Sequence, residues 1–368
     1  IVVVLDVERT LHIMTASLPL GRFSGIPIRA HWSTALVALL FGLSFTAQLG
    51  VVAGIVATVA FFLSILAHEL GHALVARRHG VETQGIDLWA LGGVARLDRE
   101  APTPRAEALI AVAGPAGSLV RGAVGLGVGV ALESAAVFSI GFITALLAVF
   151  NMLPGAPLDG GRVVRAWRWA RTGDRYRATR DAGNAGRVLG WSLGLLGVGL
   201  VFAGQPGIFL AVVGAFIAMS ARVEIASSYV VEQFAGQRVG DLAWFGVAHA
   251  GNDMDADSMI WQRSRSGGAG AVAVDATGDG QIDGIVLEEQ LWAIPTEQRG
   301  MTLLSQLMVP WDATARASAD DDLASVLPRL NPARPIVTVW DGDRLAGIVP
   351  MAALRERLQR AQQAVAGT

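Results

Sequence analysis

Three residues, His68, Glu69 and His72, have types and spacing that could support metal chemistry and read HELGH. Histidines four positions apart share one helix face, so both imidazoles can bind one metal ion. The Glu69 carboxylate would then lie beside the open coordination position, where it can accept a proton from bound water. The pattern predicts metal-assisted hydrolysis. The alternative is a pair of internally satisfied helix histidines beside a buried glutamate.

The setting of the motif favours the metal site. The three residues lie within the apolar segment 51–76, which is long enough to cross a bilayer. Ionisable side chains within such a segment are costly to insert, and where they occur they generally serve a function.

A catalytic zinc ion needs a third protein ligand and one open position. Cysteine is absent, so the third ligand must be His, Asp or Glu. A histidine six positions after the second is excluded, because that position holds Arg78. His79 follows two arginines at the expected end of the helix and is a weak candidate. Asp159 remains as the strongest candidate.

Asp159 follows the segment 151–158, in which Pro154 and Pro157 prevent a continuous helix. An Asp before two glycines is by itself typical of a turn. However, His68 lies nine residues before Arg77, about 13 Å along a helix, and Asp159 lies twelve residues before Arg171 in a segment that can re-form a helix after Gly161. We therefore expect both groups at one level of the bilayer, where a broken backbone lines an enclosed or wet cavity.

The composition indicates a membrane protein. Of the 368 residues, 52% are hydrophobic and 16% are charged, and the mean hydropathy is +0.48. The formal charge of −2 excludes a dedicated nucleic-acid binder. Six spans are predicted, at 32–49, 51–76, 106–132, 135–153, 188–203 and 207–221.

Arginines predict the orientation in the membrane, because they concentrate before the first span, between the second and third, and after the fourth. Both termini are therefore expected in the cytoplasm. Residues 1–13 do not resemble a signal peptide, and Met14 is the expected native start. All 29 basic residues are arginine, which suggests a GC-rich bacterial genome and hence a bacterial inner (plasma) membrane location.

The C-terminal third has the sequence pattern of a soluble α/β domain that contains an internal repeat. Segment 271–274 leads through a polar turn into 284–287, and 336–339 leads similarly into 345–349. The acidic turn 275–283 resembles an EF-hand loop, but Val286 replaces the final glutamate, which favours a plain hairpin turn. The predicted domains are 1–30, 31–223, 238–296 and 297–368.

Several segments together resemble the site-2 proteases, intramembrane zinc metalloproteases of family M50, and specifically the subgroup with two C-terminal CBS domains. The matching segments are 25–32, HELGH, 91–94, 114–118 and 151–162. The resemblance implies a polytopic α-helical membrane protein of about six transmembrane helices with a C-terminal α/β tandem CBS domain.

The resemblance also implies residue roles. His68, His72 and Asp159 would bind one zinc ion, Glu69 would be the general base, and Asn151 would help to hold the substrate or the oxyanion. Ser118 stands where many members have Asn, and we interpret it as a small residue that allows close helix packing.

A peptide bond within a transmembrane helix is shielded by its neighbours, so the substrate must unwind locally before it can be hydrolysed. Another segment of the protease must then receive the freed strand. Segment 86–97 could accept it as an added strand, with close backbone approach at Gly92 and Gly93. The equal alternative is a structural hairpin that covers the cytoplasmic mouth. Arg121, within the third span, either reaches the interface or pairs with a carboxylate such as Glu133.

The resemblance implies that the substrate is a membrane-anchored regulator, such as an anti-sigma factor, cleaved in or near its transmembrane helix. A CBS-regulated transporter and a non-catalytic receptor for membrane helices are the alternative functions. The CBS domains are expected to act through protein contacts, either by pairing with a second copy to form a homodimer or by shielding the cytoplasmic mouth of the active site. Segments 284–290 and 347–353 lack the hydroxyl donor and ribose-binding Asp that the resemblance requires, so weak or no nucleotide binding is expected.

Overall fold

A computed structural model describes residues 17–89, 92–245, 247–266, 271–330, 336–349, 354 and 356–360. The described residues form two compact units, which divide between Tyr229 and Val230. Each unit is described by itself. The predicted start at Met14 lies outside the described residues, as does the end of segment 347–353.

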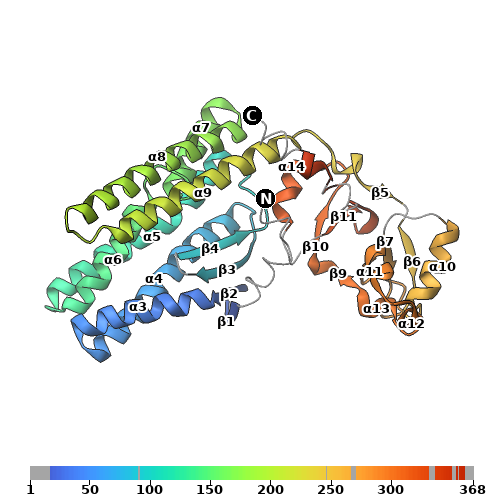
Figure 1. The fold of residues 1–368 in the computed structure, drawn as a ribbon, viewed down its shortest axis with the longest axis horizontal. Helices are drawn as coiled ribbons and strands as arrows, with labels where there is room; N and C mark the ends of the chain where they lie inside the picture. Colours follow the sequence, from blue (N-terminus) through green and yellow to red (C-terminus); the bar gives the residue numbers. More distant parts are fainter. Residues whose placement is uncertain are drawn as a thin grey trace. The chain divides into compact units, whose positions relative to one another are not determined.

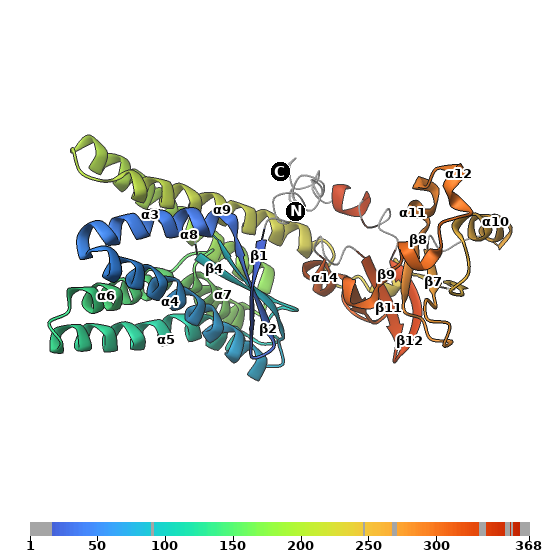
Figure 2. The ribbon, with the colours of Figure 1, turned by 90° about the horizontal axis from the view of Figure 1, so that it is seen from below.

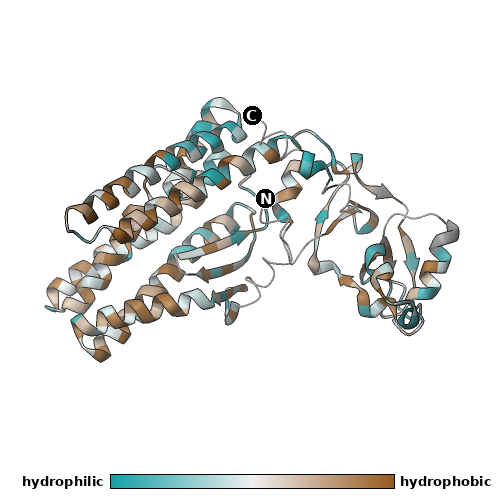
Figure 3. Ribbon diagram, in the orientation of Figure 1, coloured by the Kyte–Doolittle hydropathy of each residue, from teal (hydrophilic) through white to brown (hydrophobic). Residues whose placement is uncertain are grey.

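The first unit is a helical bundle with one small sheet (Figure 1). Five of its helices are long and apolar enough to cross a membrane, and α6, of 17 residues, is shorter. Figure 3 shows that α3 to α6 are predominantly hydrophobic along their length. The helices of this unit are α3 Trp32–Leu49, α4 Val51–Arg78, α5 Pro104–Ala131, α6 Ala135–Asn151, α7 Asp159–Thr172, α8 Arg175–Phe202 and α9 Ile208–Glu232.

This architecture confirms the predicted class of polytopic α-helical membrane protein. The last two helices extend beyond the predicted apolar spans, since α8 begins at Arg175 and α9 continues to Glu232. Hydropathy marks only the part of a helix that can lie in hydrocarbon. The polar extensions stay helical because arginine and alanine are good helix formers.

A four-stranded sheet lies beside α4 (Figure 2). Its order is β1-β2-β3-β4, with β2 and β3 parallel and the other pairs antiparallel. The sheet packs on α4 through Ile26, Ile86 and Leu88 against Ala73. The described part of segment 1–30 therefore belongs to the fold of the first unit. The strands are β1 Ser17–Phe23, β2 Ile26–His31, β3 Thr83–Trp89 and β4 Gly92–Leu97.

The second unit is an α/β repeat of two four-stranded sheets with one shared pattern. In the sheet β6-β7-β8-β9 the first pair is parallel and the next two are antiparallel, and β10-β11-β12-β5 repeats this pattern. The strands are β5 Trp244–Phe245, β6 Ala248–Ala250, β7 Ala271–Val274, β8 Gly284–Leu287, β9 Val309–Pro310, β10 Thr314–Ala317, β11 Ile336–Asp341 and β12 Arg344–Val349.

Each short leading strand pairs with the sheet of the other repeat. β5 precedes the first sheet in the chain but lies at the edge of the second, and β9 does the reverse. The two repeats are thus interleaved, and a cut at residue 296 would leave β9 outside the sheet that it completes.

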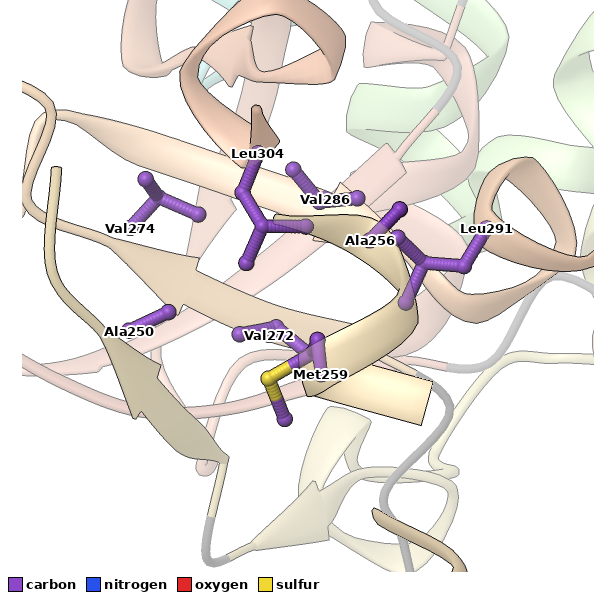
Figure 4. Close-up of a cluster of buried hydrophobic side chains, with 8 residues drawn as sticks. All are labelled: Ala250, Ala256, Met259, Val272, Val274, Val286, Leu291 and Leu304. Carbon is purple, nitrogen blue, oxygen red and sulfur yellow. The ribbon is translucent and has the colours of Figure 1, made fainter. Parts of the chain in front are cut away.

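Helices α10 and α11 pack against the first of these sheets. The cluster in Figure 4 includes Val272, Val274 and Val286 of the first sheet, Met259 of α10 and Leu291 of α11. The helices of this unit are α10 Ala256–Ser266, α11 Glu288–Ala293, α12 Thr296–Arg299, α13 Leu304–Leu307 and α14 Leu323–Val326, with 3-10 turns η1 Val239–Asp241, η2 Trp311–Ala313 and η3 Leu327–Arg329.

The acidic turn between β7 and β8 is internally satisfied. The Asp275 carboxylate accepts hydrogen bonds from the backbone N–H groups of Gly278 and Gly280, and that of Asp283 accepts from Ala276 and Thr277. These contacts agree with the hairpin turn predicted from the sequence.

Candidate metal centre and active site

The structure brings His68, His72 and Asp159 together. The histidine Nε2 atoms lie 3.1 Å apart, and Asp159 Oδ2 lies 3.1 Å from His68 Nε2 and 3.3 Å from His72 Nε2. Four tetrahedral ligands with zinc bonds of about 2.05 Å would be about 3.3 Å apart. The three atoms therefore fit one zinc ion, and they form the metal-ligand cluster found among the described residues.

The helix α4 presents both histidines to the interior, as their four-residue spacing predicts. His68, Glu69 and His72 are 6%, 8% and 6% exposed. The ring of His72 donates through Nδ1 to the Ile110 carbonyl of α5 over 2.7 Å. Because a carbonyl only accepts, the proton is on Nδ1 and Nε2 is free to bind a metal.

The approach of α5 to α4 depends on glycine. A Cβ atom at Gly114 would lie 2.3 Å from His72 Nε2, and one at Gly71 would lie 3.1 Å from the Ala113 carbonyl oxygen. Small residues allow two membrane helices to approach closely. This contact explains why segment 114–118 is part of the site.

The broken segment between α6 and α7 delivers Asp159 as the first residue of α7. A Cβ atom at Gly160 would meet the Met152 carbonyl oxygen at 2.3 Å, and one at Gly161 would meet the Ala156 nitrogen at the same distance. The Ala156 N–H donates to the Ala182 carbonyl of α8 over 3.1 Å. The segment is thus a tightly packed turn rather than an open loop.

Two ion pairs hold α7 against its neighbours. Arg165 contacts Glu107 of α5, which is 4% exposed, and Arg168 Nη2 lies 2.6 Å from Asp181 of α8. The helix that carries Asp159 is therefore fixed on two sides.

Glu69 lies beside the cluster. Its Oε2 accepts a hydrogen bond of 3.2 Å from the backbone N–H of Ala95 on β4, which orients the carboxylate. Gly93 faces it closely, because a Cβ atom there would lie 2.4 Å from Glu69 Cγ. Gly92, at the start of β4, has φ of +137°, and an added Cβ atom there would have no neighbour within 4 Å. Of the two predicted glycines, Gly93 is the one whose added Cβ atom would meet Glu69.

Asn151 ends α6 and reaches the cluster, with its Nδ2 atom 3.4 Å from His68 Nε2. Ser64, one helical turn before His68, donates to the Thr144 hydroxyl of α6 over 3.1 Å. This bond holds α6 at the level of the site.

The other described histidines lie outside the cluster. His79 caps the C-terminal end of α4, His31 caps the start of α3 through a bond to Ser33, and His249 lies on β6 of the second unit. This placement agrees with the choice of Asp159 over His79 as the third ligand.

Sequence reasoning missed two contacts from α5. The Ile110 carbonyl is a backbone group, so no side-chain pattern could reveal it. The Ser118 hydroxyl lies 3.1 Å from His68 Nδ1, although its position was interpreted through packing alone. The signal available was its place one turn after Gly114 in an otherwise apolar helix.

Comparison with known proteins points to one family. The sequence model described as Peptidase family M50 matches residues 56–138 and 131–193. The chain is 37% identical over 359 residues to a Mycobacterium tuberculosis protein named as the zinc metalloprotease Rip3, with 91% of each chain covered. A Synechocystis sp. protein named as a zinc metalloprotease is 27% identical over 375 residues, with 94% of this chain and 96% of that protein covered.

A solved structure, the site-2 protease from Methanocaldococcus jannaschii, is also similar. Its sequence identity is 29% and its TM-score is 0.46, and the match covers 57% of this chain and 95% of that chain.

Proposed function

The chain belongs to peptidase family M50 and is a membrane metalloprotease, and on that premise we propose that it hydrolyses a peptide bond in or near a transmembrane helix of a membrane-anchored regulator. The observation that carries this proposal is a buried glutamate beside a cluster of two histidines and one aspartate within apolar helices. An anti-sigma factor is one regulator of this kind. The transporter and receptor alternatives are set aside, because the relatives are named as zinc metalloproteases.

His68, His72 and Asp159 would hold one zinc ion per chain. Zinc bound there would supply Lewis acidity and a nucleophilic water. Glu69 would be the group that takes up a proton from the attacking water and delivers it to the departing amine nitrogen. Its Oε2 is engaged with Ala95, so Oε1 is the oxygen available for proton transfer. The Asn151 amide donates to the developing oxyanion of the substrate carbonyl.

The edge strand β4 accepts the unwound substrate. Among the described strands β4 pairs only with β3, and the Ala95 N–H on β4 already points to Glu69. A substrate strand added along this edge would bring its backbone close to Glu69. Because Gly93 has no side chain, β4 can itself lie close to Glu69. The alternative role is a hairpin that only covers the cytoplasmic mouth.

The arginine distribution supports an orientation in a bacterial inner membrane with both termini and the second unit in the cytoplasm. We assign the second unit as a CBS pair that forms a homodimer and binds nucleotides weakly or not at all. Its interleaved sheets make one regulatory unit of the two repeats.

The test uses purified full-length protein in lipid vesicles with a designed transmembrane substrate. Wild-type protein should contain about one zinc ion per chain and cleave the substrate, and Asp159→Ala should lose both metal and cleavage. His79→Ala is the matched control, since it removes the alternative ligand, and it should keep both. Full zinc content in Asp159→Ala would remove Asp159 from the site.

A further inference from the structure

Arg121 is a charged residue within an apolar helix and has one described polar partner. It lies near the middle of the 28-residue helix α5, where a guanidinium is costly to insert. Among the described residues Arg121 forms no ion pair, and the pairing with Glu133 considered from the sequence is not present. Its Nη2 atom instead donates to the Ser118 hydroxyl over 2.9 Å.

The same hydroxyl contacts a proposed metal ligand. Ser118 Oγ lies 3.1 Å from His68 Nδ1, and His68 Nε2 faces His72 and Asp159. Ser118 is 2% exposed, so solvent cannot readily replace its hydroxyl. A continuous chain of contacts therefore runs from Arg121 through Ser118 to the metal site.

We propose that Arg121 is a positioning residue that acts through Ser118 to hold the His68 ring in its metal-binding orientation. The inference rests on the proposed zinc-binding role of His68. A hydroxyl can accept two hydrogen bonds and donate one, whereas a guanidinium only donates. Arg121 therefore occupies one lone pair of Ser118 Oγ, and the hydroxyl remains free to contact His68 Nδ1.

The ring proton must be on Nδ1 for Nε2 to bind a metal. For His72 the Ile110 carbonyl ensures this, because it cannot donate. A serine hydroxyl can donate or accept, so with a metal ion on Nε2 it would accept from the Nδ1–H of His68. By donating to Ser118 Oγ, the guanidinium holds the serine side chain in the rotamer that contacts His68 Nδ1. This role accounts for the retention of a costly charge.

The alternative role for Ser118, close helix packing, predicts a different outcome. Ser118→Ala keeps a small side chain and would preserve packing, but it removes the hydrogen-bond acceptor. Arg121→Leu removes the donor and makes α5 more apolar, so it should not destabilise the metal-free helix bundle.

The experiment measures zinc affinity of full-length protein by competition with a chelator, together with the absorption spectrum of the cobalt-substituted site. Ser118→Ala and Arg121→Leu should each weaken zinc binding about 10- to 100-fold and alter the cobalt spectrum. The double variant should lose no more than the larger single loss, because both residues act on one ligand. Ser118→Thr, which keeps the hydroxyl, should restore near wild-type affinity.

Matched controls come from α9. Arg222→Leu removes an arginine that stacks on Trp191, and Ser228→Ala removes a buried hydroxyl that bonds to the Tyr176 carbonyl. Both should bind zinc as the wild type does. Unchanged zinc affinity in Arg121→Leu, or additive losses in the double variant, would overturn this inference and leave the proposed function intact. A wild-type protein that binds no zinc would overturn it together with the proposed function.

Discussion

At the scale of single residues, the site depends on glycines as much as on its polar groups. Gly93 and Gly114 each leave room for one functional side chain, Glu69 and His72 respectively. The HELGH spacing predicted the two histidines and the base, because one helix face determines their arrangement. The contacts of Gly93 and Gly114 join segments far apart in the chain, so a local pattern could not specify them.

Two alanine substitutions should separate these roles. Gly93→Ala should reduce cleavage at least about tenfold with zinc retained, because the added methyl group displaces the base but not a ligand. Gly114→Ala should lose zinc as well, since its methyl group would overlap the His72 ring. Metal analysis and cleavage rates on the same preparations make this comparison.

Gly127→Ala is the control for both, because a Cβ atom there has no neighbour within 4 Å. It should leave zinc content and cleavage unchanged. Equal loss of zinc in Gly93→Ala and Gly114→Ala would show that the two glycines do not divide the site in this way.

At the scale of elements, the position of α7 determines whether Asp159 reaches the histidines. The prolines predicted the break before α7, and the residue counts to Arg77 and Arg171 predicted a common depth. The contacts that dock the helix could not be predicted. Gly155 lies against Gly186 of α8, and Arg165 pairs with Glu107 of α5, which are tertiary contacts without a local signature.

The buried pair of Glu107 and Arg165 should be important for stability. Glu107→Gln leaves the arginine without its charge partner in a largely buried position, which typically costs about 3–5 kcal/mol. We expect a lower thermal midpoint and loss of zinc, because α7 carries Asp159. Arg99→Gln, which breaks the more exposed pair with Asp98, is the control and should change the midpoint little. A Glu107→Gln protein with wild-type stability and zinc content would contradict this role.

At the scale of the whole molecule, hydropathy and repetition predicted two units of different character. The hairpins β7-β8 and β11-β12 were visible in the sequence because each has two apolar strands around a polar turn. The exchange of β5 and β9 between the two sheets could not be predicted from the sequence. Each strand has only two residues, and tertiary contacts determine which sheet it joins. The helices α8 and α9 extend beyond the apolar spans predicted for them, because charge ends a membrane span but not a helix.

The second unit should not bind adenosine nucleotides tightly. Segment 284–290 reads GIVLEEQ and lacks a hydroxyl side chain and an aspartate, so it offers few groups to orient a ribose. Calorimetric titration of the full-length protein with ATP, ADP and AMP should show no micromolar binding. Micromolar affinity for any of them would favour a nucleotide-controlled regulatory unit instead.

In the proposed mechanism Glu69 acts as a base beside the metal site and is not itself a metal ligand. The most direct measurement determines zinc content and cleavage of a transmembrane substrate on the same preparation of Glu69→Gln, a nearly isosteric change. We predict near wild-type zinc content with cleavage reduced by at least about a hundredfold. Cleavage at the wild-type rate by zinc-loaded Glu69→Gln would contradict the account.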